Sequence, residues 1–231
     1  MYLQVDDLVG ISFFVTSMAL LASTAFFYME RGDVIKAWRT SITVACLVTG
    51  IAFVHYIYMR GVWLDTTSTP IVLRYVDWLI TVPLQIVEFY LILTAVGYRS
   101  VGLFWKLLIA SVVMLVTGYI GESGLGDAWL YFTIGMVAWL YILYELFFGE
   151  VSRAQLNQKK ASCNLALNCL KWIVTVGWAI YPLGYVYGYL LPSISINALN
   201  IIYNLADFVN KIAFGLVIWT AARMDTPLTE K

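Results

Sequence analysis

The chain has 231 residues, of which 61% are hydrophobic and 12% are charged, with a mean hydropathy of +0.81 and a formal net charge of zero. Soluble domains average roughly 45 to 50% apolar and 25% charged residues, so this composition excludes an ordinary soluble domain and predicts a membrane protein. The neutral balance provides no basic surface for nucleic acid, and the three cysteines show no metal-ligand spacing.

Seven apolar runs are long enough to cross a bilayer, which takes about 20 helical residues. They lie at residues 8–29, 37–59, 70–96, 101–120, 128–148, 165–191 and 197–222. The connections are short, the longest being 149–164, so no second domain fits between the runs. We therefore expect an all-α fold in which residues 1–231 form one bundle of seven transmembrane helices, with kinks at Pro83 and Pro182.

Lysine and arginine are divided unevenly between the two sides of this bundle. Eleven, including Lys171, fall on the side that holds the C-terminus, whereas only Arg60 falls on the other side. Because basic residues are enriched in cytoplasmic connections, we expect the N-terminus outside and the C-terminus in the cytoplasm. The two remaining basic residues, Arg74 and Lys211, lie within spans. A purely structural bundle has no need of them there.

The third span carries four polar residues on one helix face, within about 60° of one another. They are Arg74, Asp77, Thr81 and Glu88. Glu88 follows Asp77 by eleven residues and therefore lies roughly 16 Å closer to the cytoplasm. It has no basic partner within a helical turn, and burial favours the neutral carboxyl, so we expect Glu88 to store one proton. Arg74 lies further out, where it can balance nearby carboxylates.

The seventh span places Asp207 and Lys211 four residues apart, which is one turn apart on one face. A charge in hydrocarbon costs at least about 2.5 to 3.5 kcal/mol, so Asp207 is expected to neutralise a cation at Lys211. Asp77 can lie at a similar depth across the bundle. A deprotonated, desolvated lysine attacks aldehydes and can hold a Schiff base, whose protonated form would be that cation. A buried structural ion network is the alternative.

Three motifs carry a family resemblance. They are Arg74-Tyr-Val-Asp77-Trp-Leu-Ile-Thr81-Val-Pro-Leu-Gln85-Ile-Val-Glu88-Phe-Tyr, Trp178-Ala-Ile-Tyr181-Pro and Tyr203-Asn-Leu-Ala-Asp207-Phe-Val-Asn-Lys211. Over nearly its whole length the chain resembles the microbial rhodopsins, and among them the proteorhodopsins. The resemblance implies all-trans retinal bound to Lys211 as a protonated Schiff base, and light-driven outward proton transport. It also implies a multi-pass protein of the bacterial inner membrane that assembles as a homo-oligomer, a pentamer or a hexamer.

The resemblance also implies a role for each polar residue. Asp77 would be the primary counterion and proton acceptor, Asp207 the second counterion, and Glu88 the cytoplasmic-side proton donor. Thr81 completes the triplet of aspartate, threonine and glutamate that separates the family's proton pumps from its chloride and sodium pumps. His55 matches the family histidine that hydrogen-bonds the acceptor aspartate and adjusts its pKa, although a lone histidine is commonly an ordinary core residue.

Further residues are implied around the polyene of the retinal. Gln85 stands where blue-absorbing members of the family carry glutamine and green-absorbing members carry leucine. The aromatic residues that match the family's pocket are Trp78, Trp139, Trp178 and Tyr181, with Tyr203 in the seventh-span motif. We expect Glu122 to be a solvated residue of the outer connection between the fourth and fifth spans. A role in proton release is the alternative. Glu145 is expected as an interfacial charge.

Two rival functions remain open from the sequence. The first is a photosensor on the same scaffold, with a slow light cycle and a partner protein as its output. Glu88 argues against it, because a sensor does not need a fast internal donor. The second is a seven-helix receptor or transporter without a chromophore, which would form no visible band with retinal.

Overall fold

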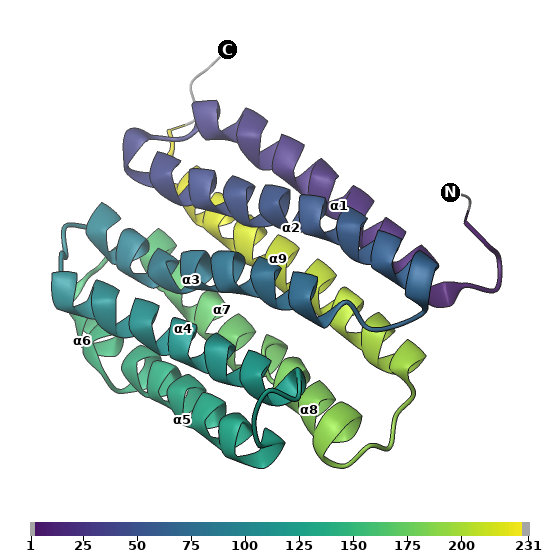
Figure 1. Cartoon of the computed structure of the whole chain (residues 1–231). Helices are drawn as coiled ribbons and strands as arrows, with labels where there is room; N and C mark the ends of the chain where they lie inside the picture. The colour runs from purple at the N-terminus through teal and green to yellow at the C-terminus, as the bar shows by residue number, and fades with distance from the viewer. Residues whose placement is uncertain (1–2, 228–231) are drawn as a thin grey trace.

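The computed structural model describes residues 3–227, which form helices joined by short connections, with no strand in that range. The α-helices are α1 Leu8–Glu30, α2 Arg39–Thr66, α3 Ile71–Ala95, α4 Val101–Glu122, α5 Ala128–Phe147, α6 Glu150–Asn157, α7 Ala161–Trp172, α8 Ile180–Tyr185 and α9 Ile196–Asp225. Together they provide seven membrane-length helical spans within the described residues, as the apolar runs predict. Figure 1 shows them as one antiparallel bundle whose two chain ends lie at opposite ends of the helices.

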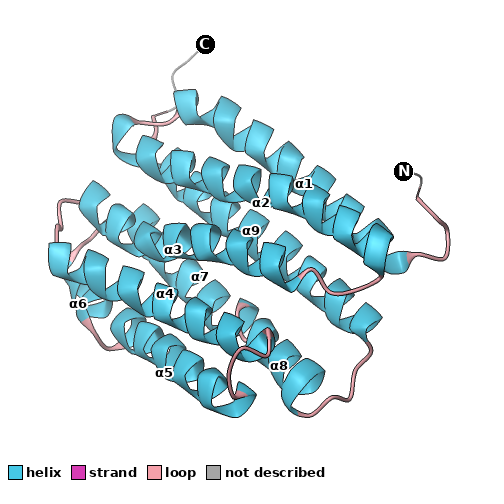
Figure 2. Cartoon of the chain, in the orientation of Figure 1, coloured by secondary structure: helices cyan, strands magenta, loops and turns pink. Residues whose placement is uncertain are grey.

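Local sequence signals set where several helices begin. Asp7, Ser100, Asp127 and Ser195 each precede a helix, and each side chain accepts a hydrogen bond from a backbone N–H in the first turn. The tight connection between α3 and α4 uses Gly97 at a φ of 93°, a conformation that favours glycine. Figure 2 shows that only short loops separate the helices.

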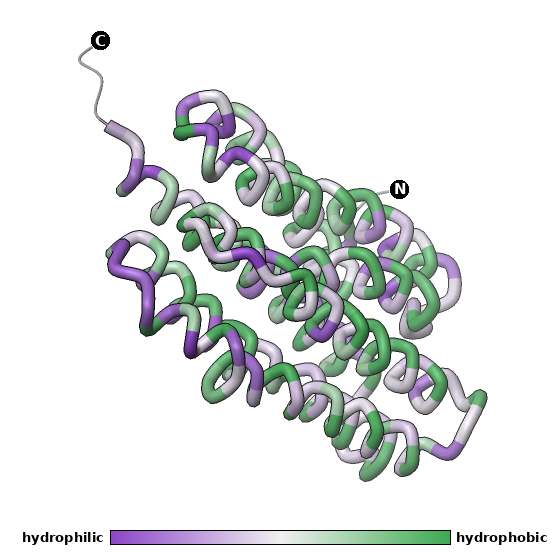
Figure 3. The backbone as a smooth tube through the Cα atoms, turned by 90° about the vertical axis from the view of Figure 1, so that its left-hand side faces the viewer, coloured by the Kyte–Doolittle hydropathy of each residue, from purple (hydrophilic) through white to green (hydrophobic). Residues whose placement is uncertain are grey.

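Two central helices, α3 and α9, carry the ionisable residues at the centre of the bundle. Of the most apolar stretch of each span, 56% is buried in α3 and 50% in α9, against 28% in α4. Hydrophobic residues dominate the lengths of the helices, and many hydrophilic stretches gather near the bundle ends (Figure 3). Because α3 and α9 are enclosed by the other helices, ionisable groups on them are shielded from lipid and can face one another.

The sixth span differs from the expected single helix 165–191. It begins at Ala161 and consists of α7, a π-helical segment Ile173–Gly177, α8 and a second π-helical segment Val186–Leu190. The irregular backbone therefore flanks Pro182, whereas α3 continues as one α-helix through Pro83. Pi-helical turns leave carbonyls out of the regular pattern, which other side chains can then reach.

Two other boundaries correct the sequence prediction. The connection 149–164 contains α6, whose Val151 and Ala154 are buried in the main core. The second span continues to Thr66 instead of ending at residue 59. Its extra turns bury Trp63, whose Nε1 donates to Asp7 Oδ1 at 3.0 Å. Tertiary packing therefore orders segments whose local hydropathy alone does not mark them as spans.

Candidate functional site

The centre of the site is Lys211 on α9, which contacts two carboxylates. Its Nζ donates to Asp77 Oδ2 on α3 at 2.5 Å and to Asp207 Oδ2 at 2.8 Å. All three side chains are almost completely buried. The structure thus brings together the lysine and both aspartates that the sequence singled out, at one depth of the bundle.

The two aspartates have different surroundings. Asp207 accepts hydrogen bonds from Tyr56 Oη at 2.9 Å, from Tyr181 Oη at 2.6 Å and from Trp78 Nε1 at 3.2 Å, in addition to Lys211. Asp77 Oδ1 has no such partner. Asp207 is therefore fixed by neutral donors on several helices, whereas Asp77 keeps a free oxygen.

His55 and Thr81 lie beside Asp77 but do not bind its carboxylate closely. His55 Nδ1 is 3.5 Å from Asp77 Oδ1 and 3.0 Å from the carbonyl oxygen of Ile51, which is its nearer acceptor. Thr81 Oγ1 donates to the backbone carbonyl of Asp77 at 3.0 Å, one turn back on the same helix. Both residues are positioned to influence Asp77, His55 through a long contact and Thr81 through the backbone.

Arg74 is buried close by without a carboxylate partner among residues 3–227. Its Nη2 donates to Asn200 Oδ1 at 3.1 Å and to Asn204 Oδ1 at 3.2 Å, and its guanidinium lies 5.2 Å from the centroid of the Tyr203 ring. The expected charge balance is therefore not a direct ion pair. Sequence reasoning missed both asparagines, although Asn200 and Asn204 precede Asp207 at helical spacing on α9.

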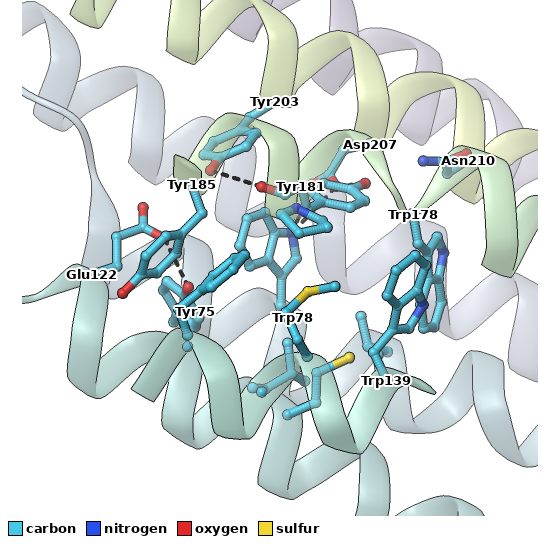
Figure 4. Close-up of a pocket in the computed structure, with 18 of the residues that line it drawn as sticks. Tyr75, Trp78, Glu122, Trp139, Trp178, Tyr181, Tyr185, Tyr203, Asp207 and Asn210 are labelled. Atoms are coloured by element: carbon cyan, nitrogen blue, oxygen red, sulfur yellow. Dashed lines mark hydrogen bonds between the residues drawn. The ribbon is translucent and has the colours of Figure 1, made fainter. Parts of the chain in front are cut away.

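A largely apolar cavity of about 830 Å³, measured out to its open edge, adjoins Lys211 and Asp207. Its walls include all the expected aromatic residues, namely Trp78, Trp139, Trp178, Tyr181 and Tyr203. Figure 4 shows Trp139 and Trp178 at one end of the cavity and Glu122 at the other. Gln85 also lines the cavity, and its Nε2 has no hydrogen-bond partner.

The π-helical segment behind the cavity is held by side chains from two other helices. Trp139 Nε1 donates to the carbonyl of Val174 at 3.2 Å, and Asn210 Nδ2 donates to the carbonyl of Gly177 at 2.9 Å. A Cβ at Gly177 would lie 2.1 Å from Asn210 Oδ1, so a larger residue there would displace the Asn210 side chain. Asn210, the neighbour of Lys211 in the chain, is a further site residue that the sequence analysis did not single out.

Glu122 is not the solvated residue that the sequence suggested. The helix α4 extends to Glu122 and turns its side chain into the bundle, where only 6% of it is exposed. Tyr75 Oη donates to Glu122 Oε2 at 2.7 Å, while Oε1 has no partner. The expectation failed because it placed the residue in the connection between spans, beyond the end of α4.

Glu145 is also buried, contrary to the expected interfacial charge. It accepts hydrogen bonds from Tyr141 Oη at 3.0 Å and from the backbone N–H of Glu150 at 2.9 Å. Lys106 Nζ lies 3.6 Å away. The burial follows from α6, which folds against the end of α5 and covers this carboxylate.

Glu88 lies on α3 apart from the Lys211 cluster. It is fully buried, and neither carboxyl oxygen has a hydrogen-bond partner. The neighbouring Phe89 and Ile92 are likewise inaccessible and apolar. An ionised carboxylate without donors is costly in such surroundings, so this geometry suits a group that carries a proton.

The comparison with family models matches residues 7–224 to the bacteriorhodopsin-like protein family. The chain belongs to the bacteriorhodopsin-like family. It is 54% identical over 95% of its length to a blue-light absorbing proteorhodopsin from Gamma-proteobacterium Hot 75m4, of which the match covers 88%. It is equally 54% identical over 95% of its length to a green-light absorbing proteorhodopsin from Gamma-proteobacterium EBAC31A08, again covering 88% of that protein.

A solved structure within this family has the same fold. The crystal structure of a blue light-absorbing proteorhodopsin from Med12 is 57% identical and superposes with a TM-score of 0.84, covering 95% of this chain and all of that one. The bacteriorhodopsin-like family and its proteorhodopsin branch, which the motifs suggested, are thereby confirmed. The blue-light and the green-light absorbing relatives are equally similar to this chain, so sequence identity alone does not assign its absorption to blue or green light.

Proposed function

We propose that this protein is a light-driven outward proton pump that carries all-trans retinal on Lys211 as a protonated Schiff base. It is then a light-driven ion transporter and not an enzyme. The single observation that supports this most strongly is the contact of Lys211 with Asp77 and Asp207 at the wall of an aromatic cavity, with Glu88 isolated further along α3.

The cavity residues fit retinal. Ligand pockets are mostly apolar with a few placed polar groups, as this one is. Indole and phenol rings line the space that a polyene would fill, and among residues 3–227 Lys211 is the only lysine on its wall. When bound, retinal supplies absorption of visible light and a change of shape that reorients the proton on the Lys211 nitrogen.

The hydrogen bonds around the aspartates favour Asp77 as the acceptor. Three neutral donors stabilise the ionised carboxylate of Asp207, whereas Asp77 has Lys211 as its one close donor. A proton that leaves the Lys211 nitrogen is therefore stabilised more on Asp77 Oδ2 than on Asp207. Asp207 stays the fixed part of the counterion. Arg74, held by two asparagines, keeps a positive charge nearby.

Glu88 refills the lysine nitrogen from the opposite side. It lies eleven residues further along α3, toward the end of the bundle where α9 ends. The excess of lysine and arginine at that end supports a cytoplasmic location. Release toward Asp77 and supply from Glu88 then move protons out of the cell.

Blue absorption is the finer part of the proposal and rests on Gln85. Its amide lines the cavity and has a free Nε2, so it can stabilise the ground and excited charge distributions of the polyene unequally.

The resemblance also supports the bacterial inner membrane as the location and a pentameric or hexameric ring as the assembly. Crosslinking in native membranes, followed by sizing, tests the ring.

A pH titration of the visible spectrum tests the proposed function. Adding all-trans retinal to the apoprotein should create a visible band, and that band should shift with pH as the carboxylate beside Lys211 gains a proton. The proposed chromophore and counterion are disproved if the protein forms no band, if the parent's band does not shift with pH, or if the band of Asp77→Asn shifts as the parent's does.

A further inference from the structure

Two asparagines of α9 turn their side-chain oxygens toward Arg74, and the other hydrogen bonds of each asparagine fix this orientation. Asn200 Nδ2 donates to the backbone carbonyl of Ile196 at 3.0 Å and to Thr69 Oγ1 at 3.1 Å. A backbone carbonyl only accepts, so the Asn200 amide cannot turn round without losing that bond. Its Oδ1 therefore remains for Arg74 Nη2, which donates to it at 3.1 Å.

The amide of Asn204 is oriented in the same way by α1. Ser12 Oγ donates its own hydrogen to the carbonyl of Val9 at 2.8 Å, so it is the acceptor for Asn204 Nδ2, which lies 2.9 Å away. Asn204 Oδ1 then accepts from Arg74 Nη2 at 3.2 Å. We call Asn200 and Asn204 the amide clamp. Side chains of α1 and α9 thus fix the position of one guanidinium on α3.

The amide clamp holds Arg74 without neutralising it. Both amide oxygens are uncharged, and no carboxylate among residues 3–227 forms an ion pair with the guanidinium. The ring centroids of Tyr203, Phe13 and Trp78 lie 5.2, 5.8 and 5.9 Å from its central carbon and stabilise the charge. Nε and Nη1 of Arg74 have no hydrogen-bond partner among the described residues. The guanidinium therefore keeps its full charge and most of its donors.

A guanidinium released from the amide clamp can reach Asp77. Arg74 and Asp77 are three residues apart on α3, so their side chains are neighbours on one helix face. Asp77 Oδ1 has no hydrogen-bond partner among the described residues and can accept from a second cation. The other charged or titratable side chains that face Asp77 come from three spans and are His55 and Tyr56 on α2, Tyr181 on α8, and Asp207 and Lys211 on α9.

We propose that the amide clamp sets the proton affinity of Asp77 by holding Arg74 away from it. A direct ion pair with Arg74 would stabilise the ionised Asp77 and make it a weak acceptor for the proton of the Lys211 nitrogen. The clamp keeps the positive charge in the interior, yet leaves Asp77 able to take that proton. Asn200 and Asn204 are positioning residues that act on Asp77 through Arg74. The inference rests on the proposed function, in which Asp77 is the acceptor.

Opposite substitutions at Asn204 test the clamp through the pH titration of the visible band. Asn204→Leu removes one acceptor and lets Arg74 approach Asp77, so the midpoint of the titration should fall by about one pH unit. Asn204→Asp pairs with Arg74 and neutralises it, so the midpoint should rise by a similar amount. Asn197→Leu and Asn197→Asp make the same changes at an exposed position of the same helix and should leave the midpoint in place.

Flash absorption distinguishes positioning of Arg74 from a general loss of packing. At a pH where Asp77 is ionised in every variant, proton transfer from the Lys211 nitrogen should be about three- to tenfold slower in Asn204→Leu, because its acceptor is weaker. The transfer should not slow in Asn204→Asp, whereas damaged packing would slow it in both variants. If Asn204→Leu forms no pigment, Asn200→Leu takes its place, with the same expected direction.

The outcomes separate the clamp from the proposed function. Midpoints that move in the same direction in both Asn204 variants, or stay at the parent value in both, overturn the clamp. A parent that forms no band, or a band that ignores pH, overturns the proposed function instead. Nitrogen NMR of labelled arginine side chains in the apoprotein then decides the clamp. The separation of the Nη1 and Nη2 resonances of Arg74, identified by their loss in Arg74→Lys, should change in opposite directions in the two Asn204 variants, and an unchanged separation overturns the clamp.

Discussion

Asp77 and Glu88 lie on the same helix face, yet their surroundings are opposite. Asp77 contacts Lys211 and lies near His55, in a region where side chains from three other helical spans make polar contacts. Glu88 has no close hydrogen-bond partner among the described residues and lies mainly among apolar side chains, with the buried Ser41 as its polar neighbour. The first environment suits a charge that exchanges a proton with its neighbour, and the second suits a neutral reserve. In the proposed pump, the direction of transport follows from this difference along α3.

The largest effect is expected at Lys211, which contacts Asp77 in the polar region of the interior. Lys211→Ala should abolish the visible band with all-trans retinal, because none of the other described residues brings an amine to the cavity wall. The substitution also leaves two buried carboxylates without their cation, at a cost of about 3 to 5 kcal/mol in stability. Lys171→Met is the matched control, since it removes the other buried lysine and should keep the band. Equal pigment yield in parent and Lys211→Ala would disprove the attachment.

The next largest effect is expected at the acceptor. Asp77→Asn replaces the carboxylate whose Oδ2 lies 2.5 Å from Lys211 Nζ with a neutral amide that does not accept a proton, so the initial rate of light-driven proton release should fall at least about 100-fold. Asp207→Asn should disturb folding and pigment stability as well, because four donors lose their charged acceptor. Pumping at the parent rate in Asp77→Asn would mean that the two aspartates have the opposite roles.

Glu88→Gln tests the role of the carboxyl group in the mainly apolar region of α3. The side chain keeps its size but has no proton to give up, and no close hydrogen-bond partner is disturbed. We expect the visible band to stay nearly in place while reprotonation of the Lys211 nitrogen slows about 100-fold, as measured by flash absorption. A recovery rate equal to that of the parent removes Glu88 from its role.

The smallest effect concerns Gln85, which lies between the two carboxyls along α3. Gln85→Leu removes the amide from the cavity wall, and the band should move to longer wavelength with pigment yield preserved. Absorption spectra of the two purified proteins at one pH measure the shift. A band that stays in place, or moves to shorter wavelength, contradicts the tuning role.

The sequence predicts much of the polar cluster because its members are spaced on single helices. Lys211 and Asp207 are four residues apart, and the polar face of α3 follows from helical periodicity. The spacing of residues along a helix is the same in the folded bundle. The contact of Lys211 with Asp77 therefore requires only that α3 and α9 face each other. The family motifs add the cavity aromatics, all of which line the wall.

What the sequence does not predict depends on packing between distant segments. Neighbouring helices bury Glu122 and Lys171, and the local sequence around these residues does not predict that packing. The same holds for Asn210, whose partner is a carbonyl exposed by a π-helical turn in the sixth span. The short, polar helix α6 gives no span signal, since its order comes from contacts with α3, α5 and α7.

The direction of light-driven proton movement tests the central claim most directly. Cells that express the protein with retinal, suspended in unbuffered medium, should acidify the medium on illumination, and a protonophore should abolish the change. The Lys211→Ala protein at equal expression is the control. Sustained acidification that begins and ends with the light is the result the asymmetry of α3 predicts. Alkalinisation of the medium, or a light cycle with no net proton movement, would contradict it.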